Sequence, residues 1–436
     1  MPGTTEAFAG YLCRKAGTIS VRQKRMAEVC LRDYLAVTAA GARKNRASWQ
    51  PLLACLPPGN AELVGWPERT DPKTAALING FNAHSLELDD GQRFAMIHLG
   101  ASVISAIRAA SALHPIGNEA RVRGIVMGYE AACRLSIAMQ PAHKQRGYHA
   151  AGTCGTVGAA VGVAFALGMT RPQLMRVLSA AAGSSAGMLE IQEQASELKP
   201  YNLGRAAMDG LAAAFMGWTG FAPPEDMLAG ERGFFRLFAG TWDESKLLAE
   251  CPGFEIDRIY LKPYASCRHS HSAVEAALQL HGQAEGRSIE RITVETYRLG
   301  VKGHDHQEVH GVASAKLSTP YAVAVALLRG RAGVAQFEPL DEEAVALARK
   351  VEVRENPDMT AECPGKRMAR VRVRLADGRE FERCVGHAKG EPENPMDSKE
   401  LEEKWNGLAM FPDGGAPGVR EDGTAGQIVK QKGTQE

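Results

Sequence analysis

The feature that most constrains this chain is a long stretch of small, helix-forming residues. Alanine, glycine, leucine and methionine dominate from residue 73 to about residue 250, and runs of β-branched residues are scarce there. Alanine is the best helix former, and small side chains let helix backbones approach closely. Gly155, Gly158 and Gly162 indicate one such close crossing. This stretch therefore predicts several short helices around a shared core.

The segment before that stretch shows two patterns. Apolar residues of 20–40 recur at helical spacing, which predicts a helix there. Residues 41–72 contain five prolines, Pro51 among them, and proline interrupts helices and favours turns. We therefore predict turns and a connecting loop over residues 41–72.

A different composition begins near Phe254. Residues 292–296 alternate between apolar and polar side chains, which indicates a strand, and helical patterns occupy residues 271–282 and 319–328. We predict an α+β domain over residues 256–390. Residues 398–408 are helical again, and residues 411–436, rich in glycine and charge, are predicted to be a disordered tail.

The clearest strand pair flanks the sequence Ala376-Asp377-Gly378. A three-residue loop with Gly378 in the left-handed region places opposite charges and apolar side chains across from each other, whereas a two-residue loop would set Arg374 against Phe381. The predicted pairs are Arg374 with Glu380, Val373 with Phe381, and Arg372 with Glu382. The arginines then form a solvated strand face neutralised by glutamates, which is a simpler explanation than an anion site.

Charge and cysteine content exclude several classes of protein. Lys plus Arg number 51 and Asp plus Glu number 50, so no bulk basic field supports nucleic-acid binding. The nine cysteines contain no CxxC pair, so we expect reduced thiols rather than a disulfide framework or a zinc ribbon. We see no signal-peptide pattern, and the most apolar stretch, residues 159–169, is too short to span a bilayer. We therefore expect a cytoplasmic protein that does not bind membranes.

Ionisable residues interrupt the small-residue sequence at residues 84–102. Glu87, Asp89 and Asp90 form an acidic cluster that Gly91 ends, and His98 follows before a helix-like run. An imidazole beside carboxylates is suited to act as a general base. A helix end followed by a loop also explains these residues.

Two further segments combine a basic or ionisable residue with a helix start. His149 and Thr153 precede a glycine-rich helix, whose amides favour an anion such as a carboxylate. Neither a phosphate loop nor a dinucleotide fingerprint is present. Lys199 precedes Pro200, which favours an extended backbone and suits a carboxylate-binding residue, although an ordinary loop lysine also fits.

Residues 261–271 place Lys262, Tyr264, Cys267, Arg268, His269 and His271 together at the change of composition. Metal binding by His269 and His271 is disfavoured, because their spacing directs them to different helix faces and no third-ligand motif follows. A polar hinge that lines an active site is the simpler interpretation. His304, His306 and His310 also suggest a metal, but we assign none.

Taken in order from about residue 20 to about residue 410, these segments resemble the MmgE/PrpD family of dehydratases, decarboxylases and epimerases that act on small polycarboxylates. The motifs that carry the resemblance are residues 76–80 with His84 and Asp89-Asp90, residues 147–149 with 155–158, Lys199-Pro200 with Gly204, residues 262–264 with 267–271, residues 316–324, and residues 390–395. Their order and spacing together make the resemblance specific.

The resemblance implies a mainly α protein: an all-α domain built from both chain ends, residues 1–255 and 391–410, and an inserted α+β lid, residues 256–390. It also implies a homodimer and a site without cofactor or metal in the cleft between the domains. Catalytic roles fall to Asp90, His98, His149 and Tyr321. Substrate binding falls to Lys199, Lys262, Glu87, Arg268 and His271.

The chain departs from the family pattern at the site. Family dehydratases and decarboxylases look like DxDDT followed by HPS, whereas this chain has Glu87 at the first acidic position, Gly91 in place of the threonine, and Leu99-Gly100 after His98. Asn202 stands where the family often has a histidine. The substrate therefore does not follow from the resemblance.

We expect a hydro-lyase that acts on a 2-methylcitrate-like hydroxy polycarboxylate, in which a base removes a C–H proton beside a carboxyl group and cations stabilise the developing charge. An epimerase or a decarboxylase on the same scaffold is the alternative. A catalytically silent member of the family is a third hypothesis; the retention of His149, Lys199, Lys262 and Tyr321 argues against it, whereas Gly91 and Asn202 leave it open.

Overall fold

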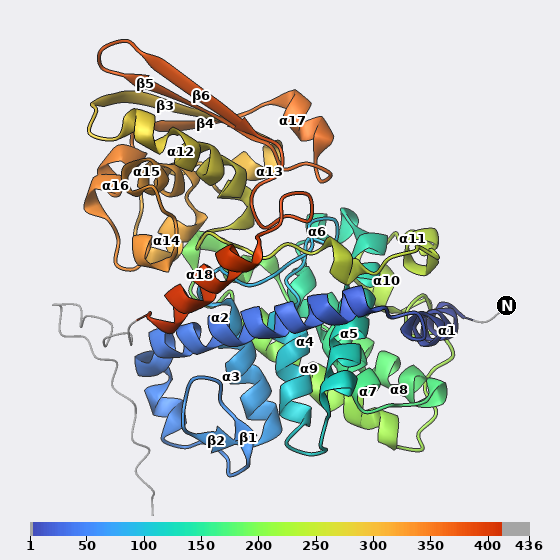
Figure 1. The fold of residues 1–436 in the computed structure, drawn as a ribbon. Helices are drawn as coiled ribbons and strands as arrows, with labels where there is room; N and C mark the ends of the chain where they lie inside the picture. The colour runs from blue at the N-terminus through green and yellow to red at the C-terminus, as the bar shows by residue number, and fades with distance from the viewer. Residues whose placement is uncertain (1–2, 412–436) are drawn as a thin grey trace, which may run out of the picture.

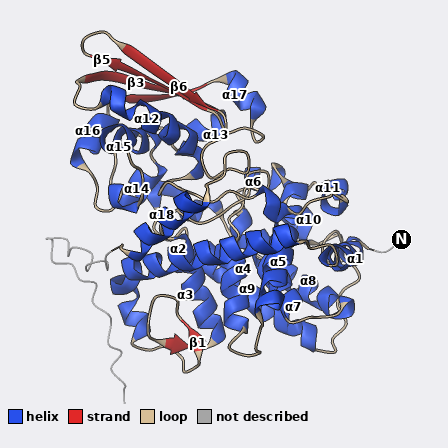
Figure 2. Ribbon diagram, in the orientation of Figure 1, coloured by secondary structure: helices blue, strands red, loops and turns tan. Residues whose placement is uncertain are grey.

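The computed structural model describes residues 3–411, in which eighteen α-helices and six strands form a mainly α fold (Figures 1 and 2). A large helical body carries a smaller lid, whose sheet lies at the edge farthest from the body. The fold class predicted from the sequence is confirmed. The tail predicted for residues 411–436 lies, apart from Phe411, outside the described residues.

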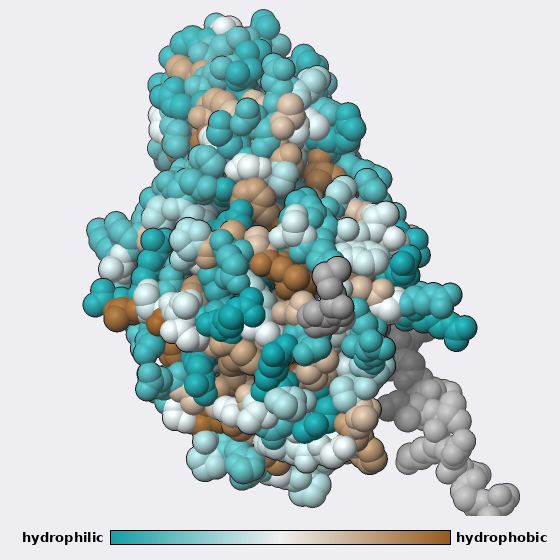
Figure 3. Space-filling model, turned by 90° about the vertical axis from the view of Figure 1, so that its right-hand side faces the viewer, coloured by the Kyte–Doolittle hydropathy of each residue, from teal (hydrophilic) through white to brown (hydrophobic). Residues whose placement is uncertain are grey.

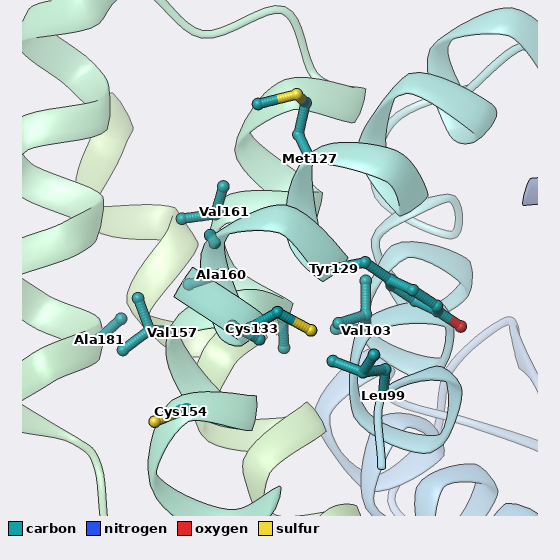
Figure 4. Packing of buried hydrophobic residues seen from close by; sticks show 14 of the residues in the cluster. Leu99, Val103, Met127, Tyr129, Cys133, Cys154, Val157, Ala160, Val161 and Ala181 are labelled. Carbon is teal, nitrogen blue, oxygen red and sulfur yellow. The ribbon is translucent and has the colours of Figure 1, made fainter. Parts of the chain in front are cut away.

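Four helices make the centre of the body: α4 (Gly100–Ala110), α5 (Asn118–Met139), α7 (Ala150–Ala166) and α9 (Tyr201–Ala214). All seventeen residues of α7 are buried, because alanine and glycine leave room for neighbours on every side. A Cβ added at Gly158 would lie 2.8 Å from the Gly128 carbonyl oxygen of α5. Figure 4 shows the apolar side chains packed around this crossing. The close approach of helices predicted from Gly155, Gly158 and Gly162 is confirmed.

The other helices of the body surround this centre. They are α1 (Thr4–Ala16), α2 (Val21–Leu53), α3 (Pro72–His84), α6 (Ala142–Gln145), α8 (Arg171–Gly183), α10 (Phe234–Phe238) and α11 (Glu244–Leu248), with a small β1 (Ala61–Glu62) and β2 (Arg69–Thr70) pair.

Helix α2 continues beyond the predicted end. The loop predicted from residue 41 was wrong up to Leu53, because the helix runs through Pro51. Pro51 lies in the last turn, where it removes only a hydrogen bond near the end of the helix. Ala40, Gly41 and Ala42 are buried against the body, and Gly41 allows contact with the backbone of Asn82. Packing along this face therefore sustains the helix.

The lid contains a four-stranded sheet in the order β4 (Val351–Glu355), β3 (Ile289–Thr296), β5 (Ala369–Leu375) and β6 (Glu380–Val385). Helices α12 (His271–Ala284) and α15 (Thr319–Arg329) pack between the sheet and the body (Figure 1). The shorter lid helices are α13 (Arg298–Val301), α14 (Val312–Leu317), α16 (Glu342–Ala348) and α17 (Pro357–Glu362).

The hairpin of β5 and β6 has the predicted register. Arg374 lies opposite Glu380, Val373 opposite Phe381 and Arg372 opposite Glu382. Gly378 adopts a φ of 87°, the left-handed conformation that the three-residue loop requires. Val371 and Val373 are fully buried, whereas Arg372 forms an ion pair with Glu382 on the opposite face. Both predictions for the hairpin, its loop and its solvated arginine row, are confirmed.

The C-terminal helix α18 (Ser398–Ala409) lies along α2 (Figure 1). The Trp405 indole donates to Asp33 at 2.9 Å, and the guanidinium of Arg32 lies 4.1 Å from the centre of the Trp405 ring. These contacts support our proposal that residues 391–410 belong with residues 1–255 in one domain and that residues 256–390 form the other. Among residues 3–411, no helix is long and apolar enough to cross a membrane.

Candidate active site

A cavity of about 870 Å³ lies where the body meets the lid. Its wall includes His98, His149 and Lys199 from the body and Tyr260, Arg268 and His304 from the lid. The cationic side chains along it outnumber the three acidic ones, and they are Lys144, Lys199, Arg268, Lys302 and Arg367. In Figure 3 the surface of the narrower lid is mostly polar. A cavity with this charge balance favours small anions.

The loop after α3 brings Glu87 between two lysines. Lys262 Nζ donates to Glu87 Oε2 at 2.8 Å, and Lys199 Nζ donates to Glu87 Oε1. Burial alone would raise the pKa of Glu87, but Lys199 and Lys262 hold it well below its usual range. Glu87 adopts a φ of 54°, a left-handed conformation that is strained for a residue other than glycine. The predicted carboxylate-binding lysines therefore meet a carboxylate of the chain itself.

The carboxylate of Asp89 contacts two histidine side chains. Its Oδ2 accepts a hydrogen bond from His84 Nδ1 at 2.8 Å and lies 3.3 Å from His98 Nδ1. The pKa of His84 is raised, because Asp89 and Glu87 outweigh the burial that would lower it. Burial lowers the pKa of His98 to about 4, although Asp89 opposes this shift. At neutral pH His98 is therefore an uncharged imidazole.

The tautomer of His98 follows from its hydrogen bond to the backbone. His98 Nδ1 lies 2.9 Å from the Asp90 carbonyl oxygen, which only accepts, so the proton is on Nδ1. This leaves Nε2 as the basic nitrogen, and no residue among those described bonds to it. His98 lines the cavity, so the site offers a neutral base there.

Asp90 itself has a structural position. Its Oδ1 accepts from the Gly100 amide at 2.9 Å, at the start of α4, and its Oδ2 accepts from the Tyr129 hydroxyl. Burial raises the pKa of Asp90 to about 6. Asp90 does not line the large cavity. It acts on the site through its carbonyl, which orients His98.

His149 has the opposite tautomer. Asn202 Nδ2 lies 3.3 Å from the Met188 carbonyl oxygen, which fixes the amide nitrogen on that side, and the same nitrogen lies 3.0 Å from His149 Nδ1. His149 Nδ1 therefore accepts, and the proton is on Nε2. Burial, followed by Lys199, lowers the pKa of His149 well below its usual value. The cavity thus has a neutral hydrogen-bond donor in addition to the base, and Asn202, a departure from the family pattern, sets its tautomer.

The lid side of the cavity contains cationic groups that lack full hydrogen bonding. Arg268 forms an ion pair with Glu391, but its buried Nη1 has no partner among the described residues. Arg367 Nη2 donates to the Arg93 carbonyl oxygen at 3.0 Å, and its buried Nε likewise has no partner there. Burial lowers the pKa of Arg268 to about 10, so it stays charged at neutral pH. An anion in the cavity would balance the charge of Arg367, which pairs with no carboxylate among the described residues.

Five predicted residues do not line the cavity: Asp90, Glu87, Lys262, His271 and Tyr321. The first three lie directly behind its wall, and the other two lie inside the lid. His271 is fully buried, with Nε2 3.1 Å from the Ser266 carbonyl oxygen. Tyr321 lies inside the lid, where its hydroxyl donates to the Gln336 carbonyl at 2.9 Å and accepts from the Asp341 amide at 2.9 Å. Because these bonds use the hydroxyl in lid packing, we leave Tyr321 out of the proposed catalytic set.

Tyr260 was missed from the sequence. A Cβ at Gly91 would lie 2.4 Å from the Tyr260 hydroxyl, so the absent side chain at residue 91 makes room for this phenol. Tyr260 lines the cavity, and its ring centre lies 6.5 Å from that of His98. The sign in the sequence was Gly91, which stands where the family has a threonine. It indicated that the threonine hydroxyl is absent, but it did not indicate that the Tyr260 hydroxyl lies in the same place. Arg367 and Lys144 were also missed, because no motif surrounds them.

One group of side chains has the composition of a small metal site. His84, Asp89 and His98 can each offer one ligand atom, and these atoms lie within 4.8 Å of one another. However, the buried Lys262 ammonium lies 3.7 Å from Asp89 Oδ1, and a second cation there would be repelled. His304 and His306 instead bond to the carbonyl oxygens of Leu317 and Ser314. These contacts favour ion pairing and hydrogen bonding as the roles of the histidines.

Known proteins resemble the chain over most of its length. Residues 6–245 match the family model of the MmgE/PrpD N-terminal domain, and residues 264–412 match that of the MmgE/PrpD C-terminal domain. Cis-aconitate decarboxylase of Aspergillus terreus is 24% identical over 88% of this chain and 84% of its own length. The human cis-aconitate decarboxylase is 23% identical over 78% of this chain and 73% of its own.

A relative with a different activity is similar to a comparable extent. The 2-methylcitrate dehydratase of Cupriavidus necator is 27% identical over 74% of this chain and 71% of its own length. The relatives thus include both a decarboxylase and a dehydratase, and the two family models together span both the body and the lid. This chain therefore belongs to the MmgE/PrpD family.

Proposed function

We propose that the protein is a cofactor-independent lyase that removes water from a small hydroxy polycarboxylate, as a 2-methylcitrate dehydratase does. The relatives named for cis-aconitate and 2-methylcitrate support a polycarboxylate substrate. The cationic lining and the incompletely bonded Arg268 and Arg367 support the same class of substrate.

The observation that carries the proposal is the state of His98. Its pKa of about 4 leaves it neutral, with Nε2 as an unoccupied acceptor at the cavity wall. A dehydration begins with removal of a C–H proton, which requires a neutral base. A decarboxylation ends with protonation of a carbanion, which requires an acid. A neutral His98 therefore favours dehydration.

In the proposed reaction the substrate carboxylates lie against Arg268, Arg367 and Lys199. His98 Nε2 takes the proton from the carbon beside a carboxyl group, and the electron pair of that C–H bond forms the double bond as the C–O bond breaks. The leaving hydroxyl takes the proton back from the His98 imidazolium, so one water leaves and His98 is neutral again. His149 Nε2–H donates to an oxygen of the carboxyl group beside the reacting carbon, where negative charge develops as the C–H bond breaks.

Glu87 and Asp89 have a complementary task. Asp89 lies 3.3 Å from His98 and stabilises the imidazolium while it exists. Glu87 pairs with the ammonium groups of both lysines. Burial would lower the pKa of Lys262, but Glu87 and Asp89 raise it above its usual value, so Lys262 stays charged. In this proposal Lys262 acts through Glu87 and Asp89, whereas Lys199, which lines the cavity, also contacts substrate.

Decarboxylation of a cis-aconitate-like substrate is the second candidate, because relatives with that name cover most of the chain. One experiment separates the candidates. The purified protein is incubated in D2O with 2-methylcitrate, citrate and cis-aconitate, and products are followed by proton NMR and by CO2 release.

Loss of water with no CO2 supports the proposal. CO2 release identifies a decarboxylase, and deuterium incorporation with inversion and no elimination identifies an epimerase. A protein that turns over none of a broader panel of polycarboxylates is catalytically silent towards this class. The homodimer and the cytoplasmic location stay predictions, to be tested by light scattering and by fractionation.

A further inference from the structure

A second reactive group lies on the lid side of the same cavity and has no role in the proposed dehydration. Cys267 Sγ lies 3.8 Å from His304 Nε2, and both residues line the cavity. His304 Nδ1 lies 2.9 Å from the Leu317 carbonyl oxygen, which only accepts. The His304 proton is therefore on Nδ1, and Nε2 is free to take the thiol proton.

The surroundings hold this pair in place. The His269 ring stacks on His304, with ring centres 5.1 Å apart and planes inclined by 28°. His269 Nδ1 is in turn 2.6 Å from the Tyr297 hydroxyl, and the Cys267 amide donates to the Lys316 carbonyl at 2.7 Å. A nucleophile, a base and a group that orients the base are the parts of an activated thiol.

The charges around Cys267 also favour its thiolate form. Burial would raise the pKa of Cys267, but His304, with a smaller effect from Lys199, lowers it to about 6. The other described cysteines with a resolved shift all have a raised pKa, and they are Cys13, Cys30, Cys133, Cys154 and Cys363. Cys267 thus differs from them by its position, since buried cysteines without a base are unreactive.

We propose that Cys267 and His304 form a thiolate–imidazolium pair that makes this cavity a covalent binding site for small anionic electrophiles, in particular monoesters of α,β-unsaturated dicarboxylic acids, whose ester group activates the double bond. The thiolate supplies the nucleophile, and Arg268, Arg367 and Lys144 supply the attraction for a carboxylate. This site does not depend on which reaction the enzyme catalyses.

The step is balanced without an oxidant. The Sγ lone pair forms a bond to the β-carbon of the electrophile, and the π electrons of the C=C bond move to the α-carbon and its ester group. His304 then gives the proton it took from the thiol to the α-carbon. The net change is the addition of S–H across the double bond, and the adduct blocks the cavity.

Two probes that differ in charge test the proposal: monomethyl fumarate, which is an anion, and dimethyl fumarate, which is neutral. Adducts are measured at each cysteine by peptide mass spectrometry after a short incubation. The exposed Cys55, Cys251 and Cys384 are references within the same chain, and they remove the difference in intrinsic reactivity between the probes. We expect Cys267 to react about 3- to 10-fold faster than the references with the anion, because its larger thiolate fraction outweighs its lower nucleophilicity. The advantage should be smaller with the neutral ester.

His304→Asn provides the matched variant, since an asparagine amide retains a donor for the Leu317 carbonyl and removes the base. It should bring the rate at Cys267 down to that of the references and leave the references unchanged. Equal rates at Cys267 and the references in the wild-type protein would overturn the proposal without any variant. An unchanged Cys267 rate in a folded His304→Asn protein would overturn the role of the pair.

Discussion

Behind the cavity wall that the helical body supplies, buried carboxylates have cations or histidines beside them: Glu87 lies 2.8 Å from Lys262 of the lid, and Asp89 lies 2.8 Å from His84. On the lid wall, Arg268 pairs with Glu391, but the buried Arg367 forms no ion pair with a carboxylate among the described residues. Buried ions are costly unless paired, so an anion in the cavity would balance the charge of Arg367. In the proposed function the body therefore supplies the acid–base groups and Lys199, and the lid supplies the other anion-binding groups.

Loss of the base on the body wall should have the largest effect. His98→Asn should reduce kcat on the true substrate by about 10²- to 10⁴-fold, the usual contribution of a general base. Steady-state kinetics and a thermal melt of the same preparation would measure this. A variant with near-normal turnover would remove His98 from the mechanism, and a collapsed Tm would make its role structural.

Loss of an anion-binding group on the lid wall should have the next largest effect. Arg367→Met should lower kcat/KM by about 30- to 1,000-fold, because a charge-assisted contact to a substrate carboxylate is lost. Arg372→Met is the matched control, since Arg372 is half-exposed and pairs with Glu382 on the outer face of the sheet. Equal effects of the two substitutions would end the distinction between the walls.

The pH profile separates the two walls as well. The pKa of His98 is about 4 and that of Arg268 about 10, so both are in their working forms between these values. As pH falls through about 4, His98 gains a proton, and kcat/KM should fall about tenfold per unit below that pH. A profile of kcat/KM against pH tests this. An acid limb at or above the usual histidine value, about 6.5, would contradict the shifted pKa of His98.

Gly91, whose backbone bonds to that of Tyr260 between the body and the lid, should not tolerate a larger side chain. Gly91→Ala should lower stability by about 1–3 kcal/mol, because its methyl group meets the Tyr260 hydroxyl and the Ile97 carbonyl. The control is Gly282→Ala in α12, where nothing lies within 4 Å of the added Cβ and the helix should gain up to about 1 kcal/mol. Urea unfolding of both variants measures the difference. A neutral Gly91→Ala would show that Tyr260 moves aside readily.

Removal of metal should have the smallest effect. Dialysis against EDTA should leave turnover unchanged, because Lys262 already supplies the cation beside Asp89. Activity that is lost on dialysis and restored by zinc or iron would make His84, Asp89 and His98 metal ligands. It would also break the assignment of the body wall to acid–base chemistry.

The sequence was most informative where structure is local. The β5–β6 register followed from the period-two alternation and from the loop that Gly378 permits. The close helix crossing followed from the glycines of α7, since a Cβ at Gly158 would lie 2.6 Å from the Ala132 Cβ. The end of α2 did not follow, because Pro51 lies in the last turn, where proline removes only a hydrogen bond near the helix end, and because Trp49, Leu52 and Leu53 pack, partly buried, against a small apolar cluster. The order of residues along the chain does not indicate these contacts.

By itself the sequence determined the fold class and the family. It also indicated most of the ionisable residues on the body side of the site, because each of them lies in a short recognisable motif. Only the tertiary structure decided how these residues are used. Glu87 and Lys262 are 175 positions apart, yet they form a buried ion pair, and Asn202 sets the tautomer of His149 from another helix. The phenol of Tyr260 fills the space beside Gly91. The physical reason is that pKa values, tautomers and unfilled hydrogen bonds depend on neighbours in space, which one sequence read along its length does not identify.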